Sequence, residues 1–401
     1  MLESKEVPSY KGGTVLEPKK GIYHNLVVVD VTSLYPSMAI LHNISFDTVN
    51  CECCSEDQDA KIPPEISNIL DSDGRERKNS WICKRVEGIF PKKLDLFRNE
   101  RIRQKHLGNT VKQLALKILI NGGYGVFGSK FFKYYDPRVA ELITAYGRYT
   151  LSKMQEIAKE MGLNVVYGDT DSLFIEICIN NYEECNVGNT GSRTVTQMNN
   201  NNNNNIITEQ VSKFKEECNK RLGIEVEHAK TYKTAIISSK KKHYIGWSGI
   251  PGEGLDIVGM EGEKNDRPKW INNVFRRVVR NVLGAEENNT DPISTVKKAV
   301  YDLELGKVNH ELLTRSVKLS KNPEEYHNPN DRKRRLGIAV GARKGDVIEY
   351  YESDSNKAGY SLNYQDISIR KYKLILWKTV KEILEIAGYN ISSLEQDLEL
   401  G

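Results

Sequence analysis

The sequence predicts an α+β fold with an antiparallel sheet and a mostly helical C-terminal part. Residues 164–167 and 173–177 are rich in β-branched and aromatic side chains and flank a short polar turn, which predicts a hairpin. Residues 26–30 form an apolar run that ends in an acid, the pattern of a buried strand. Beyond Trp270, apolar side chains recur at three- and four-residue spacing, which predicts helices over residues 272–283, 294–305 and 369–387.

Basic residues are clustered, although the formal net charge of the 401-residue chain is only +4. Residues 75–117 contain thirteen Lys or Arg and four acids, and residues 315–344 contain nine and three. Such clusters are typical of surfaces that bind a phosphate backbone, but each alone also fits a solvated helix face or a nuclear-localisation-like run. The sequence contains no signal peptide or membrane-length apolar run, so we expect a soluble, cytoplasmic protein with no membrane partner.

Asp169 and Asp171 lie at the tip of the predicted hairpin, with Gly168-Asp169 expected to form the turn. Two like charges this close are unfavourable unless a cation lies between them. Oxygen ligands suit Mg²⁺, which shares its remaining positions with water and substrate phosphates. A solvated acidic turn is the alternative for an isolated pair, whereas the calcium-loop pattern is absent.

Asp30 ends the predicted buried strand, and a turn and a helix start follow it. Pro36 suits the first turn of a helix, where its missing N–H costs nothing. The backbone N–H groups at the helix start could receive a phosphate; they belong to Ser33, Leu34 and Tyr35.

The two acidic stretches, in this order, resemble the D-x-x-S-L-Y-P-S and Y-G-D-T-D-S motifs of family B DNA polymerases. Residues 112–125 resemble a third motif, K-x₃-N-S-x-Y-G, with Gly122 in place of Ser. Residues 236–246 resemble the family's K-K-x-Y segment, with His243 where Arg is frequent. The resemblance is greatest to archaeal members. It implies a right-hand polymerase fold with an antiparallel palm, short helical fingers and a mostly helical thumb.

The resemblance also implies a role for each matching residue. Two Mg²⁺ ions would be held by Asp30, Asp171 and the backbone of Val31, with Asp169 as an auxiliary catalytic carboxylate. The incoming nucleotide would meet Ser33, Leu34, Tyr35, Arg101, Lys105, Lys117, Asn121 and Tyr124. Among these, the basic residues would neutralise the triphosphate and Tyr35 would lie under the sugar. The primer–template duplex would meet Lys241, Lys242, Tyr244, Lys264 and Arg267.

The implied subdivision has four segments. Residues 1–90 form the first part of the palm, with an irregular cysteine-containing insert over 42–90, and residues 91–130 form the fingers, with Thr110 capping the second helix. Residues 131–268 complete the palm and include a flexible Asn-rich insertion at 186–205. Residues 269–401 form the thumb, with a basic loop at 332–343 and a strand at 347–351.

We therefore expect a template-directed DNA polymerase that uses dNTPs, primer–template DNA and Mg²⁺. The chain begins about thirty residues before Asp30, and no exonuclease motif occurs in a suitable context. A natural split subunit or a truncated polymerase without proofreading is expected, with a separate N-terminal exonuclease chain and a sliding clamp as possible partners. Two alternatives stay open: a catalytically silent DNA-binding subunit of a replication complex, and a protein-primed polymerase.

Seven cysteines are unevenly distributed, and their odd number argues against a disulfide framework. Cys51 and Cys54 have C-x₂-C spacing, with Cys53 between them and Cys83 downstream. Ordinary thiols or a local disulfide are expected ahead of a zinc knuckle, because a second C-x₂-C and paired histidines are both missing.

Overall fold

The structure is a computed structural model, and it describes residues 11–73, 80–179, 200–250, 253–264, 266–285, 290–354 and 359–398. The chain divides into two compact units. Among these residues, the first unit contains 11–18, 25–179 and 200–231, and the second contains 19–24 and the residues from 232 onward. No helix in these ranges is both long enough and apolar enough to cross a membrane.

The sheet of the first unit has the strand order β2-β3-β1-β4. Its strands are β1 (Gly21–Val31), β2 (Asn164–Asp169), β3 (Ser172–Glu176) and β4 (Val226–Ile237), of which β1 and β4 continue into the second unit. β3 is antiparallel to both β1 and β2, and the β1–β3 register runs from Leu26↔Glu176 to Asp30↔Ser172. The predicted hairpin and the predicted buried strand are thus confirmed.

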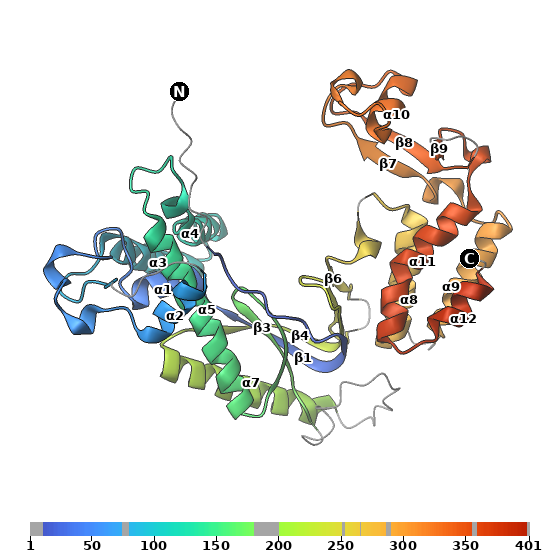
Figure 1. The fold of residues 1–401 in the computed structure, drawn as a ribbon. Helices are drawn as coiled ribbons and strands as arrows, with labels where there is room; N and C mark the ends of the chain where they lie inside the picture. The colour runs from blue at the N-terminus through green and yellow to red at the C-terminus, as the bar shows by residue number, and fades with distance from the viewer. Residues whose placement is uncertain are drawn as a thin grey trace. The chain divides into compact units, whose positions relative to one another are not determined.

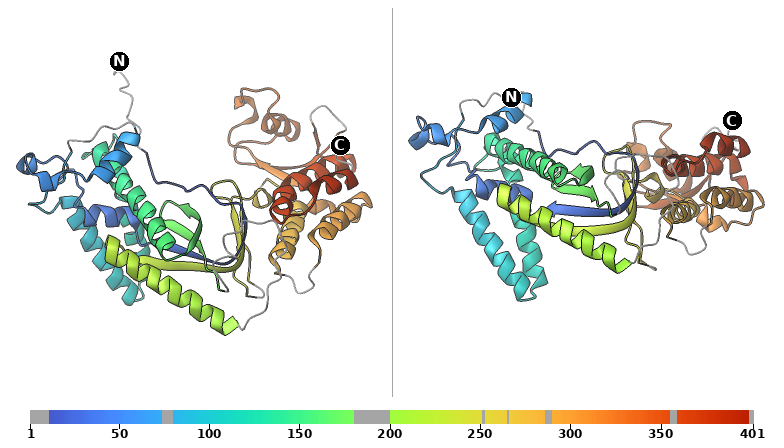
Figure 2. Two further views of the ribbon diagram at one scale, coloured as in Figure 1. Left: turned by 60° about the horizontal axis from the view of Figure 1, so that its bottom comes forward. Right: turned by 90° about the horizontal axis from the view of Figure 1, so that it is seen from below.

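Helices pack against this sheet and build its core (Figures 1 and 2). They are α1 (Leu34–Leu41), α2 (Pro64–Ser72), α3 (Ile89–His106), α4 (Thr110–Gly122), α5 (Pro137–Glu160) and α7 (Asn200–Leu222). Alternate residues of β1, namely Val27, Val29 and Val31, are buried in one apolar cluster with side chains of α5 and α7. Because strand side chains alternate between faces, Asp30 projects from the opposite face.

Three local predictions in this unit were wrong. The cysteine-containing insert is not irregular throughout, since α2 buries Ile66 and Leu70 within it. The cap of α4 is Asn109, whose side chain accepts the N–H of Lys112, and not Thr110. The Asn tract is part of α7 from Asn200 onward, because the apolar residues that follow it anchor the helix in the core; residues 186–199 of the predicted insertion lie outside the described ranges.

The second unit combines two antiparallel sheet regions with helices. Its strands are the later part of β4, β5 (Tyr244–Trp247) and β6 (Asp256–Val258), and β7 (Arg315–Lys318), β8 (Val347–Glu352) and β9 (Tyr360–Ser361). Its helices are α8 (Lys269–Leu283), α9 (Pro292–Glu304), α10 (Arg332–Val340), α11 (Ile369–Ile386) and α12 (Ile391–Asp397). The three predicted C-terminal helices and the strand at 347–351 are confirmed. The basic segment after Asp331 is largely helix α10 rather than a loop, because the Asp331 side chain caps its first turn.

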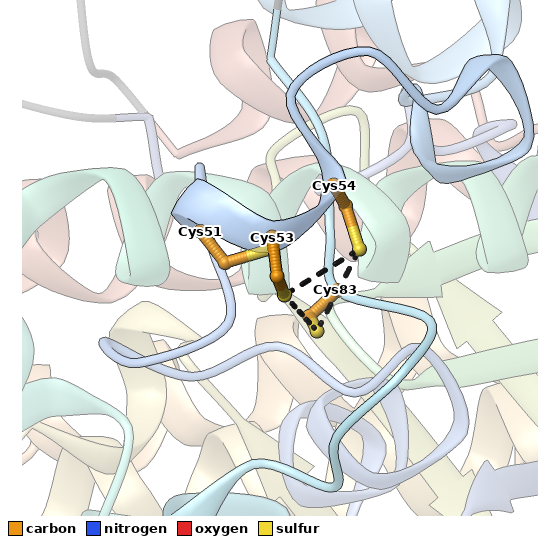
Figure 3. A group of neighbouring side chains, drawn as sticks. All are labelled: Cys51, Cys53, Cys54 and Cys83. Carbon is orange, nitrogen blue, oxygen red and sulfur yellow. Dashed lines mark hydrogen bonds between the residues drawn. The ribbon is translucent and has the colours of Figure 1, made fainter.

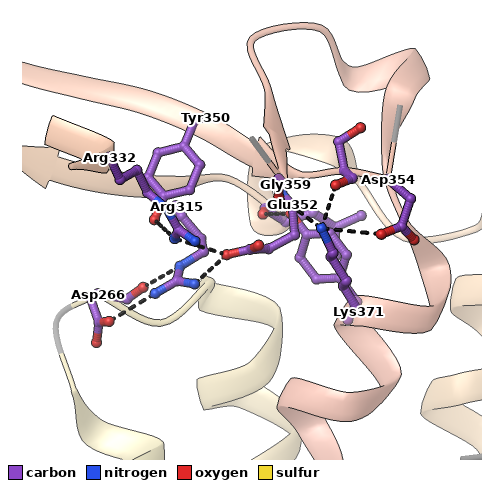
Figure 4. A network of polar contacts seen from close by, with 11 residues as sticks. Asp266, Arg315, Arg332, Tyr350, Glu352, Asp354, Gly359 and Lys371 are labelled. Carbon is purple, nitrogen blue, oxygen red and sulfur yellow. Dashed lines mark hydrogen bonds and ion pairs between the residues drawn. The ribbon is translucent and has the colours of Figure 1, made fainter. Parts of the chain in front are cut away.

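A polar network ties β7 and β8 to the segment before α8 (Figure 4). The Arg315 guanidinium forms ion pairs with Asp266, at 2.8 Å, and with the buried carboxylate of Glu352. Arg332 also contacts Glu352, at 3.3 Å, and donates a hydrogen bond to the Tyr350 hydroxyl at 2.9 Å. The buried charge of Glu352 is therefore stabilised by its two arginine partners.

We expect Glu352→Ala to lower the free energy of unfolding by about 3 kcal/mol, because it leaves a largely buried arginine with only one of its carboxylate partners. Chemical denaturation followed by circular dichroism measures the change. Glu349→Ala is the matched control, since Glu349 is an exposed acid on the same strand. Equal losses in the two variants would contradict a stabilising role for the network.

His42, at the end of α1, is stacked on Tyr146 with ring centroids 3.8 Å apart. Burial lowers the pKa of His42 to about 4, and the charge of Lys84 acts in the same direction. The unfolded chain binds this proton below about pH 6.5, whereas the folded chain binds it only near pH 4. Stability is therefore lost as the pH falls through this window.

Lowering the pH from 7 to 5 should reduce the free energy of unfolding of both proteins. We expect the reduction to be about 2 kcal/mol larger in the wild type than in His42→Gln, because each unit of pKa shift corresponds to about 1.4 kcal/mol. Urea denaturation at the two pH values measures this difference, and the glutamine variant corrects for all other titrating groups. An identical pH dependence of the two proteins would show that His42 is not buried in its neutral form.

Candidate functional site

The turn of the acidic hairpin lies two residues later in the chain than the sequence predicts. β2 continues through Gly168 and Asp169, and the turn consists of Thr170, with φ of 59°, and Asp171. Gly168 serves close packing instead: a Cβ on it would lie 2.6 Å from Leu16 Cδ1 and 2.9 Å from Leu173 Cδ2. The expectation that Gly168-Asp169 forms the turn was therefore wrong, and the glycine is explained by a neighbouring side chain that the sequence alone does not reveal.

Asp30, Ser172 and Asp169 form a row across β1, β3 and β2. Ser172 is the register partner of both aspartates, and direct partners in antiparallel strands share a face. Two strand spacings separate the ends of the row, or about 10 Å. Asp171 lies nearer to β1, because its carbonyl oxygen accepts the N–H of Val31 at 2.8 Å.

The electrostatics of Asp30 identify a further acid. Burial raises the pKa of Asp30, and the negative charges of Asp171 and Glu227 raise it further, whereas Lys230 lowers it. Glu227 and Lys230 lie on β4, and sequence reasoning missed both. Each is an ordinary charged residue in a strand, and only the pairing of β4 with β1 makes them neighbours of Asp30.

This acidic group fits divalent cations. Its side-chain donors are carboxylate oxygens, and mutual repulsion disfavours full ionisation when no cation is bound. Hard ions such as Mg²⁺ prefer these donors and keep positions open for phosphate oxygens. Asp30, Asp171 and the Val31 carbonyl are the residues that could hold such ions.

The segment after Asp30 presents the start of α1. Ser33 adopts a left-handed conformation, with φ of 50°, and its side chain does not cap the helix, so the first N–H groups of α1 are not satisfied by that side chain. The Ser37 hydroxyl donates to the Thr32 carbonyl at 2.9 Å and fixes the turn. The buried Thr32 hydroxyl oxygen has no hydrogen-bond partner among the residues that the structure describes.

Tyr35 and Tyr124, predicted to meet the nucleotide, lie together. Their ring centroids are 4.4 Å apart with an angle of 46° between the planes. Gly147 of α5 leaves room for Tyr35, because a Cβ there would approach Tyr35 Cε1 to 3.1 Å. The structure thus joins two residues that are 89 positions apart in the sequence.

The antiparallel pair α3 and α4 carries the predicted triphosphate ligands. Arg103 and Lys112 both pair with Glu100, at 2.7 and 3.0 Å, and hydrogen bonds from Arg103, Lys112 and Gln104 lower the pKa of Glu100 to about 2. By contrast, in the described part of the chain no ion pair involves the three predicted triphosphate ligands Arg101, Lys105 and Lys117. Lys105, Lys117 and Asn121 are exposed, and the buried Nε of Arg101 lacks a hydrogen-bond acceptor there.

The predicted duplex-binding residues lie in the second unit and fall into two groups. Lys241 and Lys242 are exposed in the turn between β4 and β5, and Tyr244 begins β5. Lys264 and Arg267 both pair with Glu261, at 2.5 and 2.7 Å, and these contacts lower the pKa of Glu261. A phosphate at the second group would therefore compete with an internal carboxylate.

The cysteines do not share one state. Cys178 is disulfide-bonded, which qualifies the expectation drawn from the odd cysteine count. Cys51, Cys53, Cys54 and Cys83 are free thiols, and the structure brings them together in the first unit (Figure 3). Of the two states expected for these four cysteines, ordinary thiols or a local disulfide, the structure shows thiols.

Comparisons with known proteins show the family of the chain. Residues 1–353 match the family described as DNA polymerase family B. DNA polymerase 1 of Aeropyrum pernix is 30% identical over 384 residues, covering 87% of this chain and 34% of that protein, and DNA polymerase 1 of Sulfurisphaera ohwakuensis is 29% identical over 422 residues, covering 98% and 43%. The structure of the family B DNA polymerase from the hyperthermophilic archaeon Pyrobaculum calidifontis has a similar fold, with a TM-score of 0.65, 23% identity and coverage of 97% of this chain and 48% of that one. The chain spans less than half the length of each of these relatives, and it belongs to DNA polymerase family B.

Proposed function

We propose that this chain is a template-directed DNA polymerase that adds dNTPs to a primer 3′-hydroxyl. The observation that carries the proposal is the group of acids at the end of β1 and in the β2–β3 turn, in a chain of this family. The group faces away from the α5–α7 core, and Tyr35 and the start of α1 follow Asp30 directly in the chain. An anionic substrate could therefore meet the acids and the helix start together.

The reaction would be nucleotidyl transfer at Asp30 and Asp171. Two bound Mg²⁺ ions would supply activation of the primer hydroxyl and neutralisation of the leaving pyrophosphate. Asp30 and Asp171 would hold these ions at the end of β1, because the hydrogen bond from the Val31 N–H keeps Asp171 beside this strand. Asp169, at the far end of the row, would adjust the charge of the group rather than bind directly.

The nucleotide would be bound by residues of the first unit. Arg101, Lys105 and Lys117 carry charge that no internal carboxylate neutralises among the described residues, so they would stabilise the triphosphate as charge develops on it. Tyr35 would lie under the sugar, supported by Tyr124, and Asn121 would face the nascent base pair.

The primer–template duplex would be bound by the second unit. Lys241 and Lys242 would contact phosphates, and so would Lys264 and Arg267 once they had left Glu261. In the terms of the family, residues 1–90 and 131–268 would be the palm, 91–130 the fingers and 269–401 the thumb. A separate exonuclease chain and a sliding clamp stay predictions from the family alone.

We expect Asp30→Asn and Asp171→Asn to reduce primer extension by roughly a thousand-fold, because loss of a metal-holding carboxylate removes several kcal/mol of transition-state stabilisation. Asp169→Asn should be milder. Single-turnover extension of a labelled primer measures the rates, and a filter-binding assay should show duplex affinity within about two-fold of the wild type.

Glu349→Gln is the matched control for removal of an exposed acid, and it should extend primers at the wild-type rate. Extension by Asp30→Asn near the wild-type rate would refute the site assignment. A wild-type chain that binds duplex but never extends it would instead favour the catalytically silent DNA-binding subunit.

We expect Tyr35→Ala to raise the ratio of ribonucleotide to deoxynucleotide incorporation by about ten-fold or more, because the ring would no longer exclude a 2′-hydroxyl. Tyr35→Phe keeps the ring and should keep the ratio. Competition between ATP and dATP on one template measures both. An unchanged ratio in the alanine variant would remove Tyr35 from this role.

A further inference from the structure

Four cysteine thiols converge in the insert of the first unit (Figure 3). Cys51, Cys53 and Cys54 come from the short helix at Glu52–Cys54 and the residue before it, and Cys83 comes from a segment 29 residues further along the chain. Cys53 Sγ lies 3.6 Å from the sulfur of Cys51, 3.7 Å from that of Cys54 and 3.5 Å from that of Cys83. The sulfurs of Cys54 and Cys83 are 3.9 Å apart, and all four lie within 4.8 Å of one another.

We propose that these four thiolates bind one structural Zn²⁺ ion. A tetrahedral site with Zn–S bonds of about 2.3 Å places its sulfurs about 3.8 Å apart, and the four separations given above scatter closely around that value. A disulfide would require about 2.05 Å. A cluster of several iron ions would require thiolates farther apart, because its inorganic core lies between them.

Hydrogen bonds hold the two thiol-bearing segments together. The Asn50 N–H donates to the Trp81 carbonyl at 2.9 Å, and the Trp81 N–H donates to the Asn50 side chain at 3.0 Å. The Trp81 indole N–H donates to the Cys51 carbonyl at 2.8 Å, and the Cys83 N–H donates to the Thr48 carbonyl at 3.0 Å. The thiol positions are thus fixed by the backbone around them, as expected of a preorganised metal site.

The apolar cluster directly around the thiols is small, and the adjoining residues Val49 and Ile82 belong to the main core of the unit instead. The buried apolar residues of this cluster are Cys54, Ala60 and Cys83, with Cys51 and Trp81 partly buried against them. A metal crosslink between segments distant in sequence would add stability to this small cluster. Cys53 is exposed, which gives the ion a path from solvent.

The chemical class of the ion follows from its ligands. Thiolates prefer a soft or borderline ion such as Zn²⁺, whereas the carboxylates near Asp30 prefer a hard ion. Four protein ligands leave no open position, so the role is structural rather than catalytic. The inference therefore does not depend on the proposed polymerase activity.

The test measures zinc in the full chain, purified under reducing conditions from zinc-supplemented cells, by mass spectrometry of the metal. We expect about one zinc per wild-type chain and at least a five-fold loss in Cys54→Ser and in Cys83→Ser. Cys218→Ser, a buried thiol outside the cluster, and Asp171→Asn, in the acidic group, should keep the zinc. Exchange of zinc for Co²⁺ should give the intense visible absorption of a tetrahedral thiolate site.

Two measurements on the wild-type chain do not depend on whether the cysteine variants fold. A chelator should lower the midpoint of thermal unfolding and expose four additional thiols to a thiol-reactive dye. A zinc-free wild type, iron in place of zinc, or zinc that is lost from Asp171→Asn but kept in the cysteine variants would each overturn the proposal.

Discussion

The pairing of β1 with β3 is the constraint on which the functional part of the first unit depends. Its register places Val27 and Val29 opposite Ile175 and Leu173, so that one face of both strands enters the α5–α7 core. A slip of one residue would turn these valines outward and Asp30 inward. The burial of the apolar side chains on one face therefore determines that Asp30 lies on the other face.

The acids also illustrate what a sequence can and cannot reveal. The strand that ends at Asp30 and the hairpin at 164–177 were predictable, because apolar runs and β-branched residues determine them locally. The position of the turn was not, because Gly168 is explained by Leu16, a residue more than 150 positions earlier. Glu227 was missed for the same reason, since its proximity to Asp30 arises only when β4 joins the sheet.

Charge pairing separates the basic residues of the α3–α4 pair into two kinds. Arg103 and Lys112 are held by Glu100, which joins the two helices, whereas Arg101, Lys105 and Lys117 lack such a partner within the described ranges. Sequence counting treats all of them as one basic cluster. The structure indicates that part of the cluster stabilises the helix pair and that the rest keeps its charge available for an anionic ligand.

The cysteine cluster follows the same logic with a different interaction. The sequence alone favoured ordinary thiols or a local disulfide over zinc, because a second C-x₂-C and paired histidines are missing. The strand-like contacts between residues 49–50 and 81–82 bring Cys83 to the other three thiols. Four of the six sulfur–sulfur separations match a tetrahedral site, and a bound ion explains them better than chance, because crowding free thiols offers little packing energy in return. Local backbone pairing thus creates this site, just as sheet register creates the acidic one.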